Sequence, residues 1–236
     1  MLHHIPLSKI LFLDIETVPE VEKFEHLPPK VQSLWEKKSR YQRQEDISAE
    51  DFYERAGIWA EFGKVVCLSV GYFLIHPQRE FRVTSFTGSE PELLTAFNNL
   101  ITQHFDKKDQ LLCAHNGKEF DFPFLARRML IHGIALPDKL NLFGKKPWEV
   151  PHLDTLELWK FGDYKHYTSL NLLTHVLGIP SPKSDISGDE VARVFYEEQN
   201  IARIKNYCER DVVAIAQIIL KFKGESLLDP EEIKSV

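Results

Sequence analysis

The chain has 236 residues, of which 43% are hydrophobic and 27% are charged, and its formal net charge is −6 at pH 7. This length suits one large α/β domain, and we expect a single domain over residues 1–236. The acidic balance argues against a broad basic surface for nonspecific duplex binding. No apolar run approaches the roughly 20 residues that span a bilayer, and no signal peptide is recognisable. We therefore expect a cytoplasmic protein that makes no contact with membranes.

The first predicted strand runs from Ile10 to Asp14 and leads into Ile15-Glu16-Thr17. Since side chains alternate along a strand, Asp14 and Glu16 should point to the same side. Two unit charges about 4 Å apart repel by roughly 4 kcal/mol at an effective dielectric near 20. Paired acids on a buried strand therefore indicate a positive partner, and a divalent metal ion is the simplest one. The alternative is an edge strand with two outward-facing acids.

Residues 20–62 have a helical period that is broken at Pro28-Pro29, and they predict a helical insertion between the first two strands. The aromatic residues of this insertion are expected to form a core of its own, namely Trp35, Tyr41, Phe52, Tyr53 and Trp59.

The remaining elements alternate between strands and helices. Strands over 64–74 and 80–86 should pair in antiparallel fashion, and a short buried strand follows at 111–114. Residues 137–151 predict a loop on the side of the active site, and a last strand end falls at 152–154. Helices are expected over 89–104, 122–132, 155–160, 169–177, 188–198 and 201–221, and the tail 224–236 should be partly disordered or form an added helix. The pattern predicts a mixed five-stranded sheet flanked by helices.

Further acidic residues lie in two later segments. Asp121 follows the short strand at 111–114 and precedes a helix. Tyr207 and Asp211 are four residues apart in a helical pattern, which places them on one face, one turn apart. Together with the first strand, these segments resemble the three exonuclease motifs of the tyrosine variant of the DEDD superfamily, namely Asp14-x-Glu16, Asn116-x-x-x-Phe120-Asp121 and Tyr207-x-x-x-Asp211.

The amino-acid sequences of the motifs are most similar to those of the proofreading 3′–5′ exonuclease domain of family-B DNA polymerases, and the resemblance extends over residues 10 to about 221. The resemblance implies an RNase H-like fold. It also implies a metal-dependent 3′–5′ exonuclease that hydrolyses phosphodiester bonds at the 3′ end of single-stranded or frayed nucleic acid, with DNA favoured over RNA.

Phosphodiester hydrolysis needs an activated water and relief of charge on the phosphate and the leaving oxygen. Two Mg²⁺ or Mn²⁺ ions about 3.5–4 Å apart serve these needs. We assign Asp14 as the bridging ligand, Glu16 and Asp211 to the ion that activates water, and Asp121 to the second ion. Tyr207 should orient the attacking water through its hydroxyl, because a phenol with a pKa near 10 does not abstract the proton.

The resemblance also implies contacts with the substrate near its 3′ end: Thr17 through its backbone amide, Asn116 and Phe120, and the single-strand-binding pair Ser169 and Leu170. Leu170 and Leu173 have the alternative of packing in a helix core. Lys183 lies where the family often keeps a lysine that supports catalysis, and its alternative is an exposed loop lysine.

Other residues compete for roles at the site. Asp154 is expected to cap the helix at Thr155 in preference to joining the acidic cluster. His166 could correspond to the histidine that replaces the tyrosine in the sister class of exonucleases. We reject this assignment, because Tyr207 already occupies the position one turn before Asp211. His115 is interpreted as a strand-end residue with a satisfied hydrogen bond.

Two other functions compete with the exonuclease. A HAD-like phosphohydrolase would use Asp14 as its nucleophile, but it leaves Asp121 and Tyr207 unexplained. A catalytically silent domain that binds nucleic acid would be marked by the loss of one acid, and all four acids are present.

Overall fold

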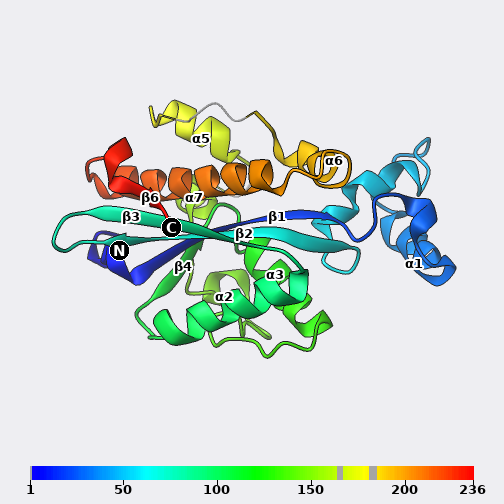
Figure 1. Ribbon diagram of the computed structural model, residues 1–236, viewed down its shortest axis with the longest axis horizontal. Coiled ribbons are helices and arrows are strands. Elements are labelled where there is room, and N and C mark those ends of the chain that lie inside the picture. The colour runs from blue at the N-terminus through cyan, green and yellow to red at the C-terminus, as the bar shows by residue number, and fades with distance from the viewer. Residues whose placement is uncertain (1, 164–166, 181–184) are drawn as a thin grey trace.

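A computed structural model describes residues 2–163, 167–180 and 185–236, and a mixed β-sheet runs through its middle (Figure 1). The sheet has six strands in the order β5-β4-β1-β2-β3-β6 within these residues. β1 pairs with β2 and β2 with β3 in antiparallel fashion, whereas the other neighbours are parallel. The strands are β1 (Ile10–Pro19), β2 (Gly63–Leu74), β3 (Glu80–Thr87), β4 (Leu111–Ala114), β5 (Leu153–Asp154) and β6 (Ile233–Ser235).

Helices cover both faces of the sheet, as expected for the RNase H-like arrangement (Figure 1). One face carries α2 (Glu90–His104) and α3 (Asp121–Ile131). The other carries α7 (Ile201–Lys223), α5 (Leu170–Val176) and α6 (Val191–Tyr196), and α4 (Thr155–Lys160) contacts α7. Among the described helices, none has both the length and the apolar character needed to cross a membrane.

β1 supplies side chains to the core on both of its faces. Leu11, Leu13 and Ile15 join the hydrophobic cluster that includes α2 and α3, while Ile10 and Phe12 join the cluster that includes α7. Because side chains alternate, Asp14 and Glu16 continue the row that begins with Ile10 and Phe12. The sequence alternation therefore directs both acids towards α7.

The predicted insertion lies between β1 and β2 at one end of the molecule (Figure 1). It contains α1 (Pro29–Ser39) and a 3₁₀ segment over Asp51–Ile58, which pack around the fully buried Trp35. The prediction of a separate aromatic core was wrong for Tyr41, whose side chain is 91% exposed. The tyrosine follows the end of α1 and points away from the packed face.

The sheet differs from the prediction in two places. A sixth strand is present because the C-terminal tail, expected to be disordered or helical, pairs β6 with β3. Arg79 binds Glu232 at 2.7 Å and helps to hold the tail against the edge of the sheet. In addition, β1 does not stop at Asp14 but continues to Pro19, because its pairing with β2 extends to Gly63. The two acids therefore lie within a strand and not at its end.

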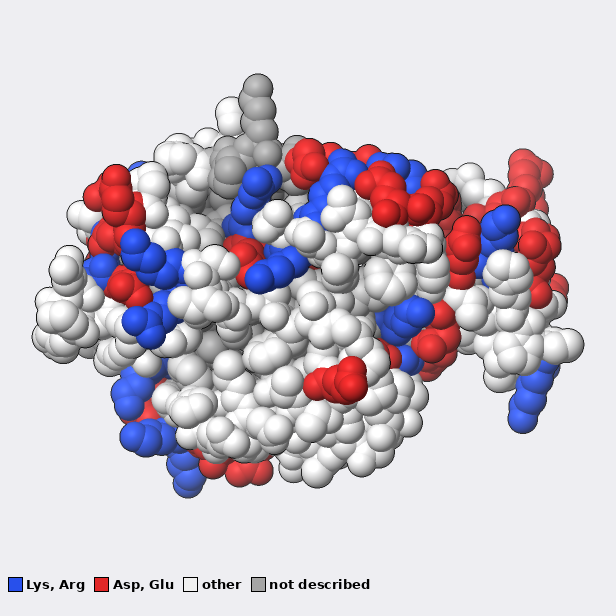
Figure 2. All heavy atoms as spheres, in the orientation of Figure 1, with Lys and Arg blue, Asp and Glu red and all other residues white. Residues whose placement is uncertain are grey.

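Charges are interspersed on the face of the molecule that Figure 2 shows. Acidic and basic side chains mix over α6 and the start of α7, and the surface over α2 and α3 is mostly uncharged. Arg193 of α6 and Arg203 of α7 both bind Glu198, which lies between the two helices. This face carries no continuous basic field, which agrees with the acidic net charge.

Candidate active site

Asp14 and Glu16 lie side by side on β1, as their spacing predicted. Their carboxylate oxygens and the sulfur of Cys208 all lie within 4.8 Å of one another. Cys208 belongs to α7, and its Sγ atom is 3.4 Å from Oδ2 of Asp14. The group therefore joins the middle strand of the sheet to the long helix above it.

Tyr207 and Asp211 face the same site from α7. Both residues line a cavity of about 770 Å³ together with Asp14, and we call it the central cavity. The four-residue spacing accounts for this placement, because residues one helical turn apart share a face. α7 begins with a cap in which Asn200 accepts a hydrogen bond from the backbone N–H of Arg203.

Asp121 approaches the site from the opposite face of the sheet, as the first residue of α3. Its side chain is only 3% exposed. It lies outside the compact group formed by Asp14, Glu16 and Cys208, but it is near enough to help raise the pKa of both Asp14 and Glu16. Three separate segments thus bring the four predicted acids into one neighbourhood.

Burial and mutual repulsion make the charged form of these acids unfavourable. Burial, followed by the neighbouring acids, raises the pKa of Asp14 and of Glu16 well above the usual range. Burial also raises the pKa of Asp121 to about 8, and that of Asp211 to about 6, where the Tyr207 hydroxyl acts in the opposite sense. A set of hard carboxylate oxygens that repel one another fits a divalent cation such as Mg²⁺ or Mn²⁺.

Tyr207 remains protonated in this environment. Burial and the charges of Asp211, Glu16 and Asp14 raise its pKa above the usual value of a phenol. Its hydroxyl can therefore donate a hydrogen bond but does not serve as a base at neutral pH.

Asp154 acts as a cap and organises a neighbouring loop, as predicted. Its carboxylate accepts hydrogen bonds from the backbone N–H groups of Leu156 and Glu157 at the start of α4. It also accepts from the N–H groups of Asn116 and Lys118, at 2.9 and 3.1 Å. These contacts hold the loop before Asp121, in which Asn116 adopts a left-handed backbone with φ 62°.

His115 is satisfied by two partners, as expected for a strand-end residue. Its ring nitrogens lie 2.8 Å from Oγ1 of Thr155 and 2.9 Å from the carbonyl oxygen of Thr168. Burial lowers its pKa. His115 lines the central cavity as a neutral, anchored side chain.

A second groove lies on the other side of Glu16. It has a volume of about 630 Å³ and is lined by Thr17 and Phe120, two of the predicted substrate contacts, and we call it the Thr17 groove. Asn116 is not among the residues that line either hollow.

The insertion supplies a wall of the Thr17 groove through Arg55 and Ile58, which sequence reasoning missed. Buried Phe52, Tyr53 and Ala56 leave these two side chains exposed on the 3₁₀ segment. The spacing of the buried residues shows which side of the 3₁₀ segment is outward, but no local pattern shows that this side faces β1.

The predicted single-strand-binding residues at the start of α5 lie in two different environments. Ser169 and Leu170 line the central cavity, and the Ser169 hydroxyl also caps α5 by accepting from the N–H of Leu172. Leu173 is fully buried in the core, so the alternative interpretation holds for this residue, and Leu170 is partly buried against the same hydrophobic cluster. Lys183 and His166 lie outside the described residues.

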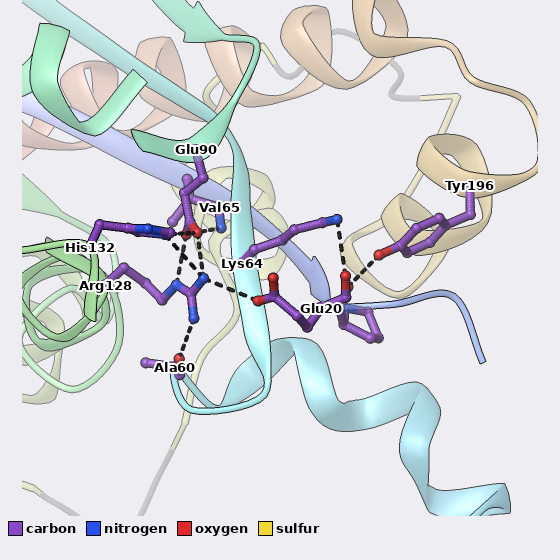
Figure 3. A network of polar contacts seen from close by, with 9 residues as sticks. Glu20, Ala60, Lys64, Val65, Glu90, Arg128, His132 and Tyr196 are labelled. Carbon is purple, nitrogen blue, oxygen red and sulfur yellow. Dashed lines mark hydrogen bonds and ion pairs between the residues drawn. The ribbon is translucent and has the colours of Figure 1, made fainter. Parts of the chain in front are cut away.

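A buried polar network holds the far end of β1 (Figure 3). Arg128 of α3 binds Glu90 of α2 and Glu20 just after β1, and it donates to the carbonyl oxygen of Ala60 at 2.9 Å. Glu90 also accepts from the backbone N–H of Val65 at 2.7 Å. The network ties both ends of the insertion to the helices beneath the sheet. Arg128 is thus buried, and is not available as a basic surface group.

Two comparisons with known proteins agree with this geometry. A model of a family described as predicted 3′–5′ exonucleases related to the exonuclease domain of PolB matches residues 59–233, which is more than half of the chain. This range contains Asp121, Tyr207 and Asp211 and begins after Asp14 and Glu16.

The structure resembles that of the family B DNA polymerase from the hyperthermophilic archaeon Pyrobaculum calidifontis. The TM-score is 0.55 and the identity 16%, over 89% of this chain and 24% of the polymerase chain. At this identity the likeness shows the fold alone, and the chain spans only a quarter of the polymerase's length. From the family match, the chain belongs to the predicted 3′–5′ exonucleases related to the exonuclease domain of PolB.

Proposed function

We propose that the chain is a two-metal-ion exonuclease that removes nucleotides from the 3′ end of single-stranded or frayed nucleic acid. The observation that carries the proposal is the convergence of carboxylates from β1, α3 and α7. Asp14 and Asp211 line the central cavity, Glu16 lines the Thr17 groove, and Asp121 lies near enough to raise the pKa of Asp14 and Glu16. Burial raises the pKa of all four carboxyl groups. Such a cluster is costly in the absence of a cation.

Two Mg²⁺ or Mn²⁺ ions would supply an activated water and neutralise charge on the phosphate and the leaving 3′ oxygen. Asp14 would bridge them, since it lies beside Glu16 and raises the pKa of that residue. Glu16 and Asp211 would hold one ion, and Asp121 the other. All four are oxygen donors, which suits these hard ions.

Tyr207 would position the attacking water. Its hydroxyl faces the cavity from the same side of α7 as Asp211, and its raised pKa keeps it protonated. Orientation of the water, and not removal of its proton, is therefore the role that its chemistry allows. Lys183 is proposed to support the reaction, on the family resemblance alone.

The two hollows beside the acids would receive the substrate strand. The terminal nucleotide would enter the Thr17 groove, where it would contact the backbone amide of Thr17 and the side chain of Phe120. Asn116 would contact the strand near the cleaved end. Ser169 and Leu170 would contact the strand in the central cavity. DNA is proposed as the favoured substrate because the motifs resemble those of the proofreading domain of family-B DNA polymerases.

One assay tests the proposal directly. End-labelled single-stranded DNA and RNA of equal sequence are incubated with Mg²⁺, with Mn²⁺ or with EDTA, and the products are resolved on a gel. We expect a ladder that shortens from the 3′ end, only with metal and faster for DNA. A strand that stays intact under all conditions but is bound by the protein would favour the alternative, a catalytically silent nucleic-acid-binding domain. The family match leaves no support for a HAD-like phosphohydrolase.

A further inference from the structure

A groove of about 350 Å³ lies along the outer face of α3. One wall consists of α3 residues three or four positions apart, including Pro123 and Arg127, which share a helix face. The other wall comes from the loop 137–151 and includes Phe143 and Lys145, and the floor is apolar. We call this hollow the α3 groove.

Two aromatic side chains stand exposed in the loop that forms the groove. Phe143 is 72% exposed and Trp148 is 76% exposed. The Nζ atom of Lys146 lies 5.3 Å from the centre of the Trp148 ring. Exposed aromatic rings beside an apolar groove are typical of an interaction site.

Unbalanced positive charge surrounds these aromatic rings. Arg127, Lys145 and Lys146 are exposed, and none of them forms an ion pair with another described residue. The carboxylate of the nearby Glu149 accepts a hydrogen bond from the backbone N–H of Lys146 at 2.8 Å and forms no ion pair with either lysine side chain of the described loop. In a protein of net charge −6, three such cations beside two exposed rings are a local exception.

The α3 groove lies along the helix whose first residue, Asp121, belongs to the proposed active site. α3 begins at Asp121, and Arg127 follows six residues later, which is roughly 9 Å along the helix axis at about 1.5 Å per residue. Lys118 lines the groove and belongs to the same loop as Asn116, held by the same Asp154 carboxylate. A strand whose 3′ end lies at the acids can therefore continue along α3 into the groove.

We propose that the α3 groove, with Phe143, Trp148, Arg127, Lys145 and Lys146, binds single-stranded nucleic acid on the 5′ side of the cleaved bond. The inference rests on the proposed function, since cleavage at a 3′ terminus leaves the rest of the strand on its 5′ side. The cations contact phosphates, and the rings stack on bases, which is the common chemistry of single-strand recognition. A protein partner would not require this combination of unpaired cations and stacking rings.

The test compares oligonucleotides of about 4 and about 16 nucleotides, which span the range of single-strand site sizes. Binding is measured by fluorescence anisotropy in EDTA, where cleavage does not occur. Trp148→Ala should weaken binding of the longer strand by about tenfold through loss of one stacked base. Binding of the shorter strand should be unchanged.

The lysines are tested through the salt dependence of binding. In the Lys145→Ala/Lys146→Ala variant, the slope of log affinity against log salt for the longer strand should fall by about 1.4, that is 2 × 0.7. Matched controls remove similar exposed groups elsewhere: Tyr41→Ala for the ring, and Lys37→Ala/Lys38→Ala for the charges. The controls should leave both strands unaffected.

The outcomes separate this inference from the proposed function. If wild type and both groove variants bind the longer strand equally, or if the variants lose both lengths equally, the α3 groove is not a site for the 5′ part of the strand. Failure of wild type to bind either strand overturns the inference as well. Wild type that binds but never cleaves in Mn²⁺ contradicts only the proposed nuclease activity.

Discussion

The sulfur of Cys208 lies 3.4 Å from the backbone oxygen of Asp14 and 3.4 Å from its carboxylate oxygen Oδ2. This contact fixes how α7 lies on β1, because Cys208 is fully buried between them. Its neighbour Tyr207, and Asp211 one turn later, consequently face the central cavity.

Cys208→Ala decides whether the thiol is a metal ligand. A thiol is a soft ligand and a weak hydrogen-bond donor, so we expect nuclease activity in Mg²⁺ to stay within about tenfold of wild type. Activity is measured with end-labelled single-stranded DNA. A loss as deep as that of Asp14→Ala would place Cys208 among the ligands.

Asp14→Ala and Asp211→Ala should each abolish nuclease activity and leave the fold intact. Each change removes a proposed metal ligand, and neither residue contributes to the hydrophobic core. The measurements are the rate of 3′ shortening and the circular dichroism spectrum. Glu157→Ala, at the exposed end of the ion pair with Lys118, serves as a control that should remain active. Near wild-type rates in either aspartate variant would refute the site assignment.

Tyr207→Phe should slow the reaction by about 100-fold, because it keeps the ring but removes the hydroxyl that orients the water. The metal dependence of the rate should be unchanged, since the carboxylates remain. A single-turnover assay at several Mn²⁺ concentrations separates the two effects. Full activity in this variant would mean that another group holds the water.

Asp121→Asn should make the metal-free protein more stable at a pH above the Asp121 pKa of about 8. There the wild-type carboxylate is ionised in a buried position near another acid, and the amide removes that charge. Mn²⁺ at a hundredfold excess over its Kd stabilises a protein by about 2.7 kcal/mol, and the variant should gain less.

Melting temperatures of wild type and Asp121→Asn, each in EDTA and in saturating Mn²⁺, check this expectation. Equal metal-free stability together with an equal response to Mn²⁺ would show that Asp121 is not part of a metal-binding cluster.

His152 should make the fold sensitive to acid. Its Nε2–H donates to the carbonyl oxygen of Lys139 at 2.7 Å, and Nδ1 accepts from the backbone N–H of Leu112 at 3.2 Å. Burial lowers its pKa to about 4 from the ordinary 6.5. The unfolded chain therefore binds more protons than the folded one between these values, and stability falls as the pH falls through that window.

The free energy of unfolding that depends on neutral His152 changes by an amount on the order of 3 kcal/mol across this pH window. His152→Gln, which does not titrate, is the comparison. The advantage of wild type over the variant in melting temperature should be largest above pH 6.5 and shrink towards pH 4. A difference that stays constant with pH would show that His152 does not remain neutral in the fold.

Local periodicity accounts for the part of the site that was predictable. Alternation along β1 placed Asp14 and Glu16 on one side, and the four-residue spacing on α7 placed Tyr207 and Asp211 one turn apart. The antiparallel pairing of β2 with β3 also followed from local patterns, as did the cap formed by Asp154. These features depend on residues close together in the chain, so the sequence alone determined them.

Contacts between distant residues decided the rest. The tail became β6 because β3 offers an unpaired edge and Arg79 binds Glu232, which is 153 residues away. Arg55 and Ile58 line the Thr17 groove because the Arg128 network fixes the insertion against the sheet, and no local pattern encodes that orientation. The proximity of Cys208 to Asp14 likewise spans 194 residues and arises only when α7 packs on β1.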